Sequence, residues 1–198
     1  MKHLIVVSHP SEGSLTMAVA HAYAAQLEEL GHSQRMHDLY RLDFDPVLTT
    51  RELVPTAAES PPCSDVAWAQ DEVRSADALC VIYPLWWMAM PAMMKGYIDR
   101  VFARGFAYEL KDNAVHGLLS GKKAVLITLS GAPMAELEQA GDWDAVQALQ
   151  DKHVFRAMGF TLLEHLHFDE IVPELSHAVV QKHLARVRTS VQRLFPAR

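Results

Sequence analysis

The sequence has few cysteines, no excess of basic residues and no long apolar run. Its two cysteines, Cys63 and Cys80, are not spaced as metal ligands or as a disulfide framework. We therefore expect a reducing, cytoplasmic environment. The formal net charge of −6 gives no electrostatic footprint for nucleic acid. The apolar runs are too short to cross a membrane, and polar residues interrupt the first of them too early for a signal peptide.

Glycine-rich nucleotide motifs are also absent. The chain contains neither the GxGxxG fingerprint nor a P-loop in a suitable context, so classical dinucleotide and nucleoside triphosphate sites have no direct support. No repeat, low-complexity segment or linker divides the 198 residues. With 50% hydrophobic and 21% charged residues, the composition is that of a globular protein. We expect a single domain over residues 1–198.

What the chain does contain is five short apolar runs, each followed by a helical pattern. The expected strands cover 4–7, 32–38, 79–83, 124–129 and 160–167. The expected helices cover 17–30, 66–75, 91–101, 143–158 and 173–194, with loop-like stretches at 38–49, 55–62 and 111–121. This alternation predicts a parallel α/β sheet with helices on both faces. A doubly wound five-stranded sheet has the order 2-1-3-4-5, in which strands 1, 3 and 4 are neighbours.

The loop after the first expected strand is small and polar, and it leads directly into a helix. Ser14 and Thr16 lie where that helix begins, and free N–H groups and the helix dipole favour a bound anion there. His9 can add a donor from the loop. Ser14 can equally be a helix N-cap, and the two roles are compatible. The pattern predicts a phosphate site.

Two adjacent tryptophans, Trp86 and Trp87, follow the third expected strand. In open α/β sheets, ligands bind at the carboxyl ends of the strands, so these indoles can wall a flat ligand. Alternatively, they pack the loop onto the core. The loop after the fourth strand, 128–132, is made of small residues that allow close backbone approach. Since strands 1, 3 and 4 are neighbours in this order, their three loops converge on one crevice. A phosphate site beside a site for a flat ring indicates a flavin nucleotide.

Three motifs carry a resemblance to a known family. They are His9-Pro10 with Ser14-Leu15-Thr16, then Asp38-Leu39-Tyr40 with Phe44-Asp45-Pro46, and finally the long stretch from Pro84-Leu85-Trp86-Trp87 to Gly105-Phe106-Ala107-Tyr108. On these motifs the chain resembles the flavodoxin-like NAD(P)H:quinone oxidoreductases of the DT-diaphorase type. That family includes bacterial relatives that serve potassium-efflux systems. The resemblance extends over most of the chain.

The resemblance implies a flavodoxin-like fold and a cytoplasmic homodimer that reduces quinones with NAD(P)H. Two electrons would move as a hydride in a ping-pong cycle, with nitro and azo compounds as further acceptors. By resemblance, the residues that hold the flavin phosphates are His9, Ser14, Leu15 and Thr16. Those that border the ring or meet its polar edge are Pro84, Leu85, Trp86, Trp87, Thr128, Ser130 and Gly131. Trp87 and Tyr108 would line the substrate site, Tyr108 from the partner subunit.

The sequence departs from the family in one place. Mammalian members carry a tyrosine and a histidine after the fourth strand that stabilise charge on the flavin, whereas residues 132–144 contain neither. We therefore assign no catalytic residue. The 9–16 pattern follows the FAD-binding members, so we expect FAD, with FMN as the alternative. A different function left open by the resemblance is that of a flavin-bound regulatory partner of a membrane potassium-efflux transporter.

Two histidines of the fifth expected strand, His165 and His167, lie two residues apart and share one face. No cysteine or convincing carboxylate cluster accompanies them, so we do not expect a metal site. We interpret both as solvent-facing side chains.

Overall fold

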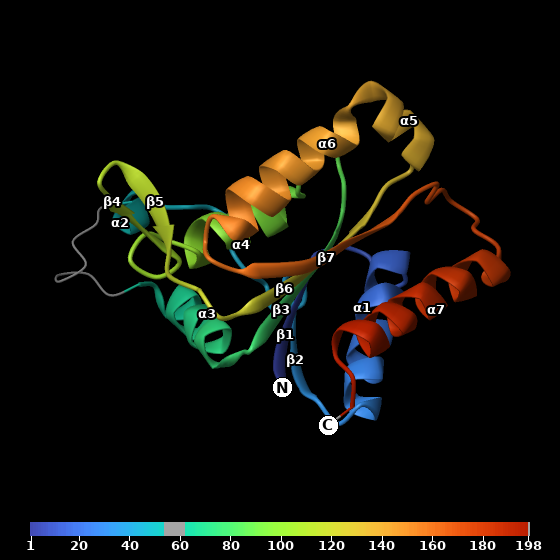
Figure 1. The fold of residues 1–198 in the computed structure, drawn as a ribbon, viewed down its shortest axis with the longest axis horizontal. Helices are drawn as coiled ribbons and strands as arrows, with labels where there is room; N and C mark the ends of the chain where they lie inside the picture. Colours follow the sequence, from blue (N-terminus) through green and yellow to red (C-terminus); the bar gives the residue numbers. More distant parts are fainter. Residues whose placement is uncertain (54–61, 198) are drawn as a thin grey trace.

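The structure, a computed structural model, describes residues 1–53 and 62–197. A five-stranded parallel sheet lies between two layers of helices (Figure 1). Its strands are β1 (Lys2–Val7), β2 (Ser33–Asp38), β3 (Ala78–Pro84), β6 (Lys123–Leu129) and β7 (Thr161–Phe168). Their order, β2-β1-β3-β6-β7, confirms the predicted 2-1-3-4-5 arrangement and the flavodoxin-like α/β fold.

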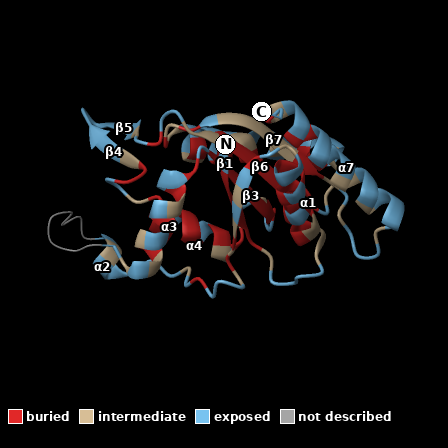
Figure 2. Ribbon diagram, turned by 90° about the horizontal axis from the view of Figure 1, so that it is seen from below, coloured by how far each residue is buried: buried red, intermediate tan, exposed pale blue. Residues whose placement is uncertain are grey.

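The burial of each strand follows its place in the sheet. All seven residues of β3, at the centre, are buried, whereas exposed residues recur along β2 at one edge. Alternate side chains of the central strands enter two separate cores. In β1, Leu4 and Val6 pack in one cluster and Ile5 and Val7 in the other, on the opposite face. Figure 2 shows this buried sheet between the inner faces of the helices.

Two helices, α1 (Leu15–Glu29) and α7 (His177–Leu194), cover one face of the sheet. The other face is covered by α3 (Ser64–Ser75), α4 (Ala92–Val101) and the π-helix η1 (Gln147–Arg156). Shorter elements complete the described chain: α2 (Thr50–Leu53), α5 (Met134–Ala140), α6 (Asp142–Val146) and a hairpin of β4 (Tyr108–Lys111) and β5 (Ala114–Gly117). No helix among the described residues is both long enough and apolar enough to traverse a bilayer.

The sequence pattern missed or misplaced some elements. The stretch 111–121, expected as a loop, contains most of a hairpin whose tip residues, Asp112 and Asn113, both have positive φ. This is the backbone of a two-residue hairpin turn. The helix expected over 143–158 is observed as α6 continued by η1. The last helix, expected from residue 173, begins at His177, and residues 173–176 before it are not helical. The loop expected at 55–62 lies almost wholly outside the described residues.

A close approach in α4 anchors the chain that follows β2. A Cβ added to Gly96 would lie 2.2 Å from the carbonyl oxygen of Pro46, so only glycine lets this turn lie against the helix. One turn of α4 further on, the buried Arg100 side chain reaches the same region. Its guanidinium lies over the ring of Phe44 and donates to the backbone of Asp45. The segment between β2 and α2 is therefore fixed relative to the sheet.

Candidate functional site

A cavity of about 610 Å³ lies at the carboxyl ends of β1, β3 and β6. This is the edge where open α/β sheets bind ligands, and the volume is in the usual range for small-molecule sites. Backbone hydrogen bonds hold the loops there: Ser8 N donates to Ile82 O at 3.1 Å, and Leu85 N donates to Leu129 O at 2.7 Å. The lining residues are His9, Ser11, Ser14, Leu15, Thr16, Pro84, Leu85, Trp86, Leu129, Ser130, Gly131, Ile171, Val172 and Pro173.

The three predicted loops therefore meet at one cavity, and most of the predicted cofactor residues line it. Two of them, Trp87 and Thr128, do not. Tyr108, predicted for the substrate site, begins the β4–β5 hairpin and is also outside this lining. A fourth segment, 171–173, was not foreseen, because it follows the edge strand β7 and has no distinctive composition. The roles of all these residues toward a ligand stay predictions.

Trp87 projects from a tight turn in the loop that follows β3. Trp86 and Ala89 exchange two backbone hydrogen bonds of 3.1 Å, and the residues between them, Trp87 and Met88, both have positive φ. Such a conformation is uncommon for residues other than glycine and marks local backbone strain. The turn leaves the Trp87 side chain 99% exposed, while Trp86 contacts the His9 ring, with centroids 6.1 Å apart.

The start of α1 forms the polar end of the cavity. Ser14 is the N-cap of this helix, and its Oγ accepts from Met17 N at 3.2 Å. The first N–H groups of a helix have no intrahelical acceptor, which leaves those of Leu15 and Thr16 available to an anion. The Ser14 hydroxyl still has its own hydrogen to donate. The N-cap role and the predicted anion role are thus compatible in this geometry.

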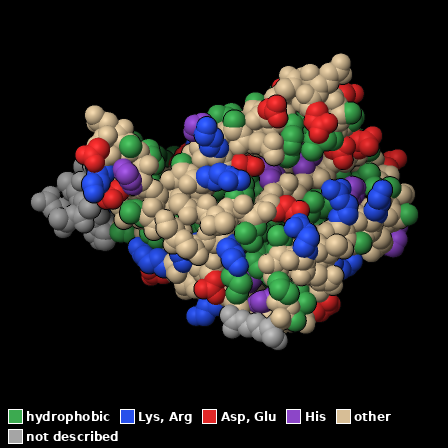
Figure 3. Space-filling view, in the orientation of Figure 1, with side chains coloured by type: hydrophobic (Ala, Val, Ile, Leu, Met, Phe, Trp, Pro, Cys, Tyr) green, Lys and Arg blue, Asp and Glu red, His purple; other side chains and the backbone are tan. Residues whose placement is uncertain are grey.

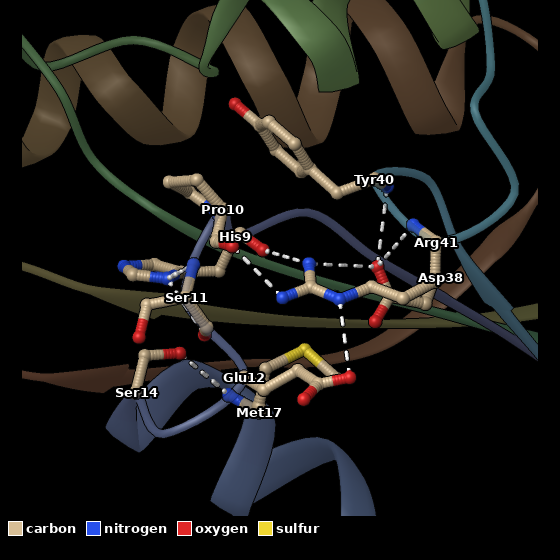
Figure 4. Close-up of polar contacts among 9 residues, drawn as sticks. All are labelled: His9, Pro10, Ser11, Glu12, Ser14, Met17, Asp38, Tyr40 and Arg41. Carbon is tan, nitrogen blue, oxygen red and sulfur yellow. Dashed lines mark hydrogen bonds and ion pairs between the residues drawn. The ribbon is translucent and has the colours of Figure 1, made fainter.

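Arg41 clamps the loop that carries His9 (Figure 4). Its guanidinium donates to His9 O at 2.9 Å and to Pro10 O at 2.8 Å. Asp38 and Glu12 lie 3.6 and 3.5 Å from the same guanidinium. The loop backbone is therefore tied to the end of β2, and the positive charge of Arg41 is already matched by two carboxylates. Nothing in the sequence pattern indicated this clamp, because its partners are backbone carbonyls.

At the other end of the cavity, Ser130 leads into a group of buried polar side chains. Thr128 Oγ1 lies 2.8 Å from both His165 Nε2 and His167 Nδ1. Ser130 Oγ lies 3.0 Å from His167 Nε2. On the far side, His165 Nδ1 lies 2.8 Å from an oxygen of Asp151 in η1. These contacts join β6, β7 and η1 in one hydrogen-bonded network.

The prediction that His165 and His167 face solvent was wrong. The His165 side chain is only 2% exposed, and His167 is buried. The indole of Trp143 covers both imidazoles, with ring centroids 4.8 Å apart in each case. Burial, followed by the proximity of His165, lowers the pKa of His167 to about 4. The strand pattern could not reveal this, because the covering residues come from α6 and η1.

Charges and metal ligands are distributed without a concentrated site. The face drawn in Figure 3 carries acidic side chains over α5 and α6, and its lysines and arginines are scattered rather than gathered in one patch. Within residues 1–53 and 62–197, no three His, Cys, Asp or Glu side chains gather in a way that would hold a metal ion. The residues that line the cavity offer hydroxyls, backbone N–H groups and aromatic rings, and Ser130 connects this lining to the histidine network.

A sequence model of the Flavodoxin_2 family, described as a flavodoxin-like fold, matches residues 1–191. The chain belongs to this family. A relative from Haemophilus influenzae, named an uncharacterized NAD(P)H oxidoreductase, is 34% identical over 142 residues, which are 71% of this chain and 70% of the relative. The human ribosyldihydronicotinamide dehydrogenase [quinone] is 29% identical over 146 residues, 66% of this chain and 63% of the human protein. The match thus spans less than two thirds of that mammalian relative.

Solved structures of flavodoxin-like proteins agree over nearly the whole chain. An NAD(P)H:quinone oxidoreductase from Methanothermobacter marburgensis has a TM-score of 0.86 at 28% identity, covering 98% of this chain and 96% of the other. A quinone reductase structure from Klebsiella pneumoniae has a TM-score of 0.87 at 25% identity, covering 100% and 86%. These homologues confirm the resemblance to the NAD(P)H:quinone oxidoreductases. An azoreductase from Bacillus anthracis in complex with FMN, with a TM-score of 0.75 at 19% identity, shares the fold.

Proposed function

We propose that this flavodoxin-like protein is a flavin-dependent NAD(P)H:quinone oxidoreductase. The proposal is supported above all by the cavity, in which the start of α1 and the apolar side chains of Leu85, Trp86 and Ile171 meet at one sheet edge. Quinone oxidoreductases among the relatives support the same activity. Nitro and azo compounds are proposed as further acceptors.

The lining fits a flavin at both ends. At the start of α1, backbone N–H groups and the hydroxyls of Ser14 and Thr16 are the donors that a phosphate requires. At the other end, Leu85, Trp86 and Ile171 offer apolar surface to a ring. A Cβ at Gly131 would lie 3.4 Å from Ile171 O, in ordinary van der Waals contact, so the loop after β6 lies close to the 171–173 segment. This donor set suits a ligand with one charged end and one flat apolar end.

Each predicted residue then has a definite task. His9, Ser14, Leu15 and Thr16 would bind the flavin phosphates, and Arg41 would hold their loop in place. Backbone and side chains of Pro84, Leu85 and Trp86 would border the ring, with Ser130 and Gly131 at its polar edge. Thr128 would act behind Ser130 through the histidine network. A bound flavin supplies the capacity to accept a hydride and to pass two electrons on.

The chain itself orients the reactants and excludes water. We propose that NAD(P)H and the quinone occupy the same apolar position in turn, against Trp86, so that each is in place only for its own half of a ping-pong cycle. The strained turn at Trp87 and Met88 would border that position. Among the described residues, Arg41 is the one cation that contacts the loop after β1. The charge of a bound phosphate would therefore be neutralised mainly by hydrogen bonds.

A second copy of the chain would complete the substrate position. Trp87 is 99% exposed, and Leu110 and Val115, which pair across the hairpin that begins at Tyr108, are exposed apolar residues. We propose a homodimer in which Tyr108 of the partner subunit reaches the cavity beside Trp87. Sedimentation of the purified protein tests this, and a species that stays monomeric at micromolar concentration would contradict it.

The identity of the cofactor is tested by releasing it. Heating the purified protein and weighing the released chromophore by mass spectrometry should give FAD, as the 9–16 pattern predicts. FMN would correct the choice of flavin and leave the proposed activity in place. Protein that contains no flavin, and takes up neither FAD nor FMN, would overturn the proposed function.

A further inference from the structure

A continuous line of hydrogen bonds runs from η1 to the wall of the cavity. It starts at the carboxylate of Asp151, passes through His165, Thr128 and His167, and ends at Ser130. The successive separations are 2.8, 2.8, 2.8 and 3.0 Å, all within hydrogen-bond range. Ser130 lines the cavity, whereas Asp151 lies in η1, which packs on one face of the sheet and does not line the cavity.

With His165 singly protonated, the chemistry of the groups sets the direction of the bonds from Asp151 to His167. An ionised carboxylate can only accept, so His165 donates to Asp151 from Nδ1–H and keeps Nε2 bare. Thr128 then donates to His165 Nε2 and accepts from His167 Nδ1–H. That leaves His167 Nε2 bare to accept from the Ser130 hydroxyl. The single Ser130 hydrogen can also go to Ala132 O, at 3.1 Å. When it goes to His167, every donor in the line points toward Asp151, and the Ser130 oxygen retains lone-pair capacity toward the cavity.

The middle of this line is closed to water. Thr128 is completely buried, His167 and Ser130 are buried, and Trp143 covers both imidazoles. Because burial lowers the pKa of His167 to about 4, this imidazole is neutral at pH 7, with one donor and one acceptor. A neutral imidazole between two hydroxyls can pass a proton in either direction, which an imidazolium or a carboxylate in the same place cannot.

Hydride transfer creates the need for such a line. An acceptor that takes a hydride gains one negative charge, and one proton neutralises it. We propose that the Asp151–His165–Thr128–His167–Ser130 line delivers this proton to the polar edge of the group bound beside Ser130. The inference rests on the proposed function. The line would act as the proton donor that residues 132–144 do not provide.

Delivery moves one proton through each group of the line in turn. When His165 is doubly protonated against Asp151, His165 donates to Thr128, Thr128 to His167, and His167 to Ser130, whose hydroxyl must turn from Ala132 O, 3.1 Å away, to donate into the cavity. Ser130 gives its proton to the bound group, and each neighbour in turn replaces the proton just lost. One proton leaves His165 and one reaches the cavity, and the line is left in its resting arrangement. Water at the edge of Asp151 then restores the proton on His165.

The groups that face this line set its response to pH. They are Asp151 from η1, the neighbouring Tyr83 of β3, and Asp169 and Arg186, which respectively raise and lower the pKa of His167. Since delivery needs a second proton on His165, we expect the proton-coupled rate to fall as pH rises. In deuterated water the proton-coupled rate should be lower than in ordinary water.

Thr128 is the residue to substitute, because its hydroxyl connects the two histidines. In Thr128→Val the proton-coupled rate should fall about 100-fold, the lower end of the range for a positioned acid or base, and lose its pH dependence and solvent isotope effect. Thr128→Ser keeps the hydroxyl and should restore all three. Ser190→Ala is the matched control, since it removes a buried hydroxyl bonded to Glu164 of the same strand but outside the line.

A readout that does not depend on turnover tests the line itself. Nitrogen-15 spectra of the purified protein should show His165 and His167 both as Nδ1–H tautomers, with His167 changed in Thr128→Val. An Nε2–H tautomer at His167 while His165 carries only its Nδ1 proton, or an unchanged pH profile and isotope effect in Thr128→Val, would overturn the relay while the wild-type protein still turned over. If Thr128→Val does not fold, Ser130→Ala makes the same test at the cavity end. Wild-type protein that NAD(P)H cannot reduce would instead overturn the proposed function.

Discussion

Replacing Ser14 with aspartate is expected to weaken flavin binding about 1,000-fold while leaving α1 folded. Aspartate is as good an N-cap as serine, so its carboxylate can accept from Met17 N in place of Ser14 Oγ. The same carboxylate would occupy the position proposed for a phosphate. Two like charges held together in an interface cost several kcal/mol, and about 4 kcal/mol corresponds to that loss of affinity. Flavin fluorescence titration of the variant measures it.

Two matched variants separate charge from helix capping. Ser14→Asn is an equally good N-cap without the charge and should bind flavin within about tenfold of wild type. Ser176→Asp makes the same change at the N-cap of α7, whose Oγ accepts from Val179 N at 3.4 Å and which does not line the cavity. It should bind flavin normally. Equal affinity in Ser14→Asp and Ser14→Asn would contradict a phosphate at this helix start.

Replacing Arg100 with methionine is expected to lower the free energy of unfolding by about 3–5 kcal/mol, the usual cost of removing one partner from a buried ion pair. Arg100 is only 5% exposed and contacts Glu52 at 2.8 Å and Asp65 at 2.7 Å. Its loss leaves the buried carboxylate of Glu52 without its cation. Urea unfolding followed by circular dichroism measures the change. Lys95→Met, which breaks an exposed pair with Asp99 on the same helix, should change stability by less than about 1 kcal/mol.

The effect of Arg100 should also depend on pH. Burial raises the pKa of Glu52, but hydrogen bonds from Thr49 and Arg100 outweigh it and bring that pKa below its ordinary value. A depressed carboxylate pKa contributes stability at neutral pH that is lost as the pH falls through the folded-state pKa. The advantage of wild type over Arg100→Met should therefore shrink in acid. Equal stability of Arg100→Met and Lys95→Met at pH 7 would contradict a stabilising role for the buried pair.

The fold was predictable because its signals are local. The central strands are short apolar runs, and a run buried on both faces reads the same wherever it lies in the sheet, as 79–83 does in β3. The strand order then follows from the general rule for doubly wound sheets. The hairpin after Tyr108 was missed because its strands are four residues long and largely exposed, so no buried face imposes a period on them.

The candidate site was predictable only where it depends on loop composition. Ser14 and Thr16 at a helix start and small residues at 130–131 point to ligand contact from the sequence alone. The orientation of Trp87 does not, since it depends on a turn with two positive φ angles. The burial of His165 and His167 depends on Trp143 and Asp151, which come from helices packed over an edge strand. Long-range packing of this kind has no signature in the strand itself.

Anaerobic addition of NAD(P)H to the purified protein shows directly whether a bound flavin passes electrons from NAD(P)H to a quinone. The proposed function predicts that the yellow absorbance of the bound flavin bleaches, and that it returns when benzoquinone is added. Absorbance that does not bleach, or that bleaches and does not return with benzoquinone, would contradict the proposed quinone reductase activity.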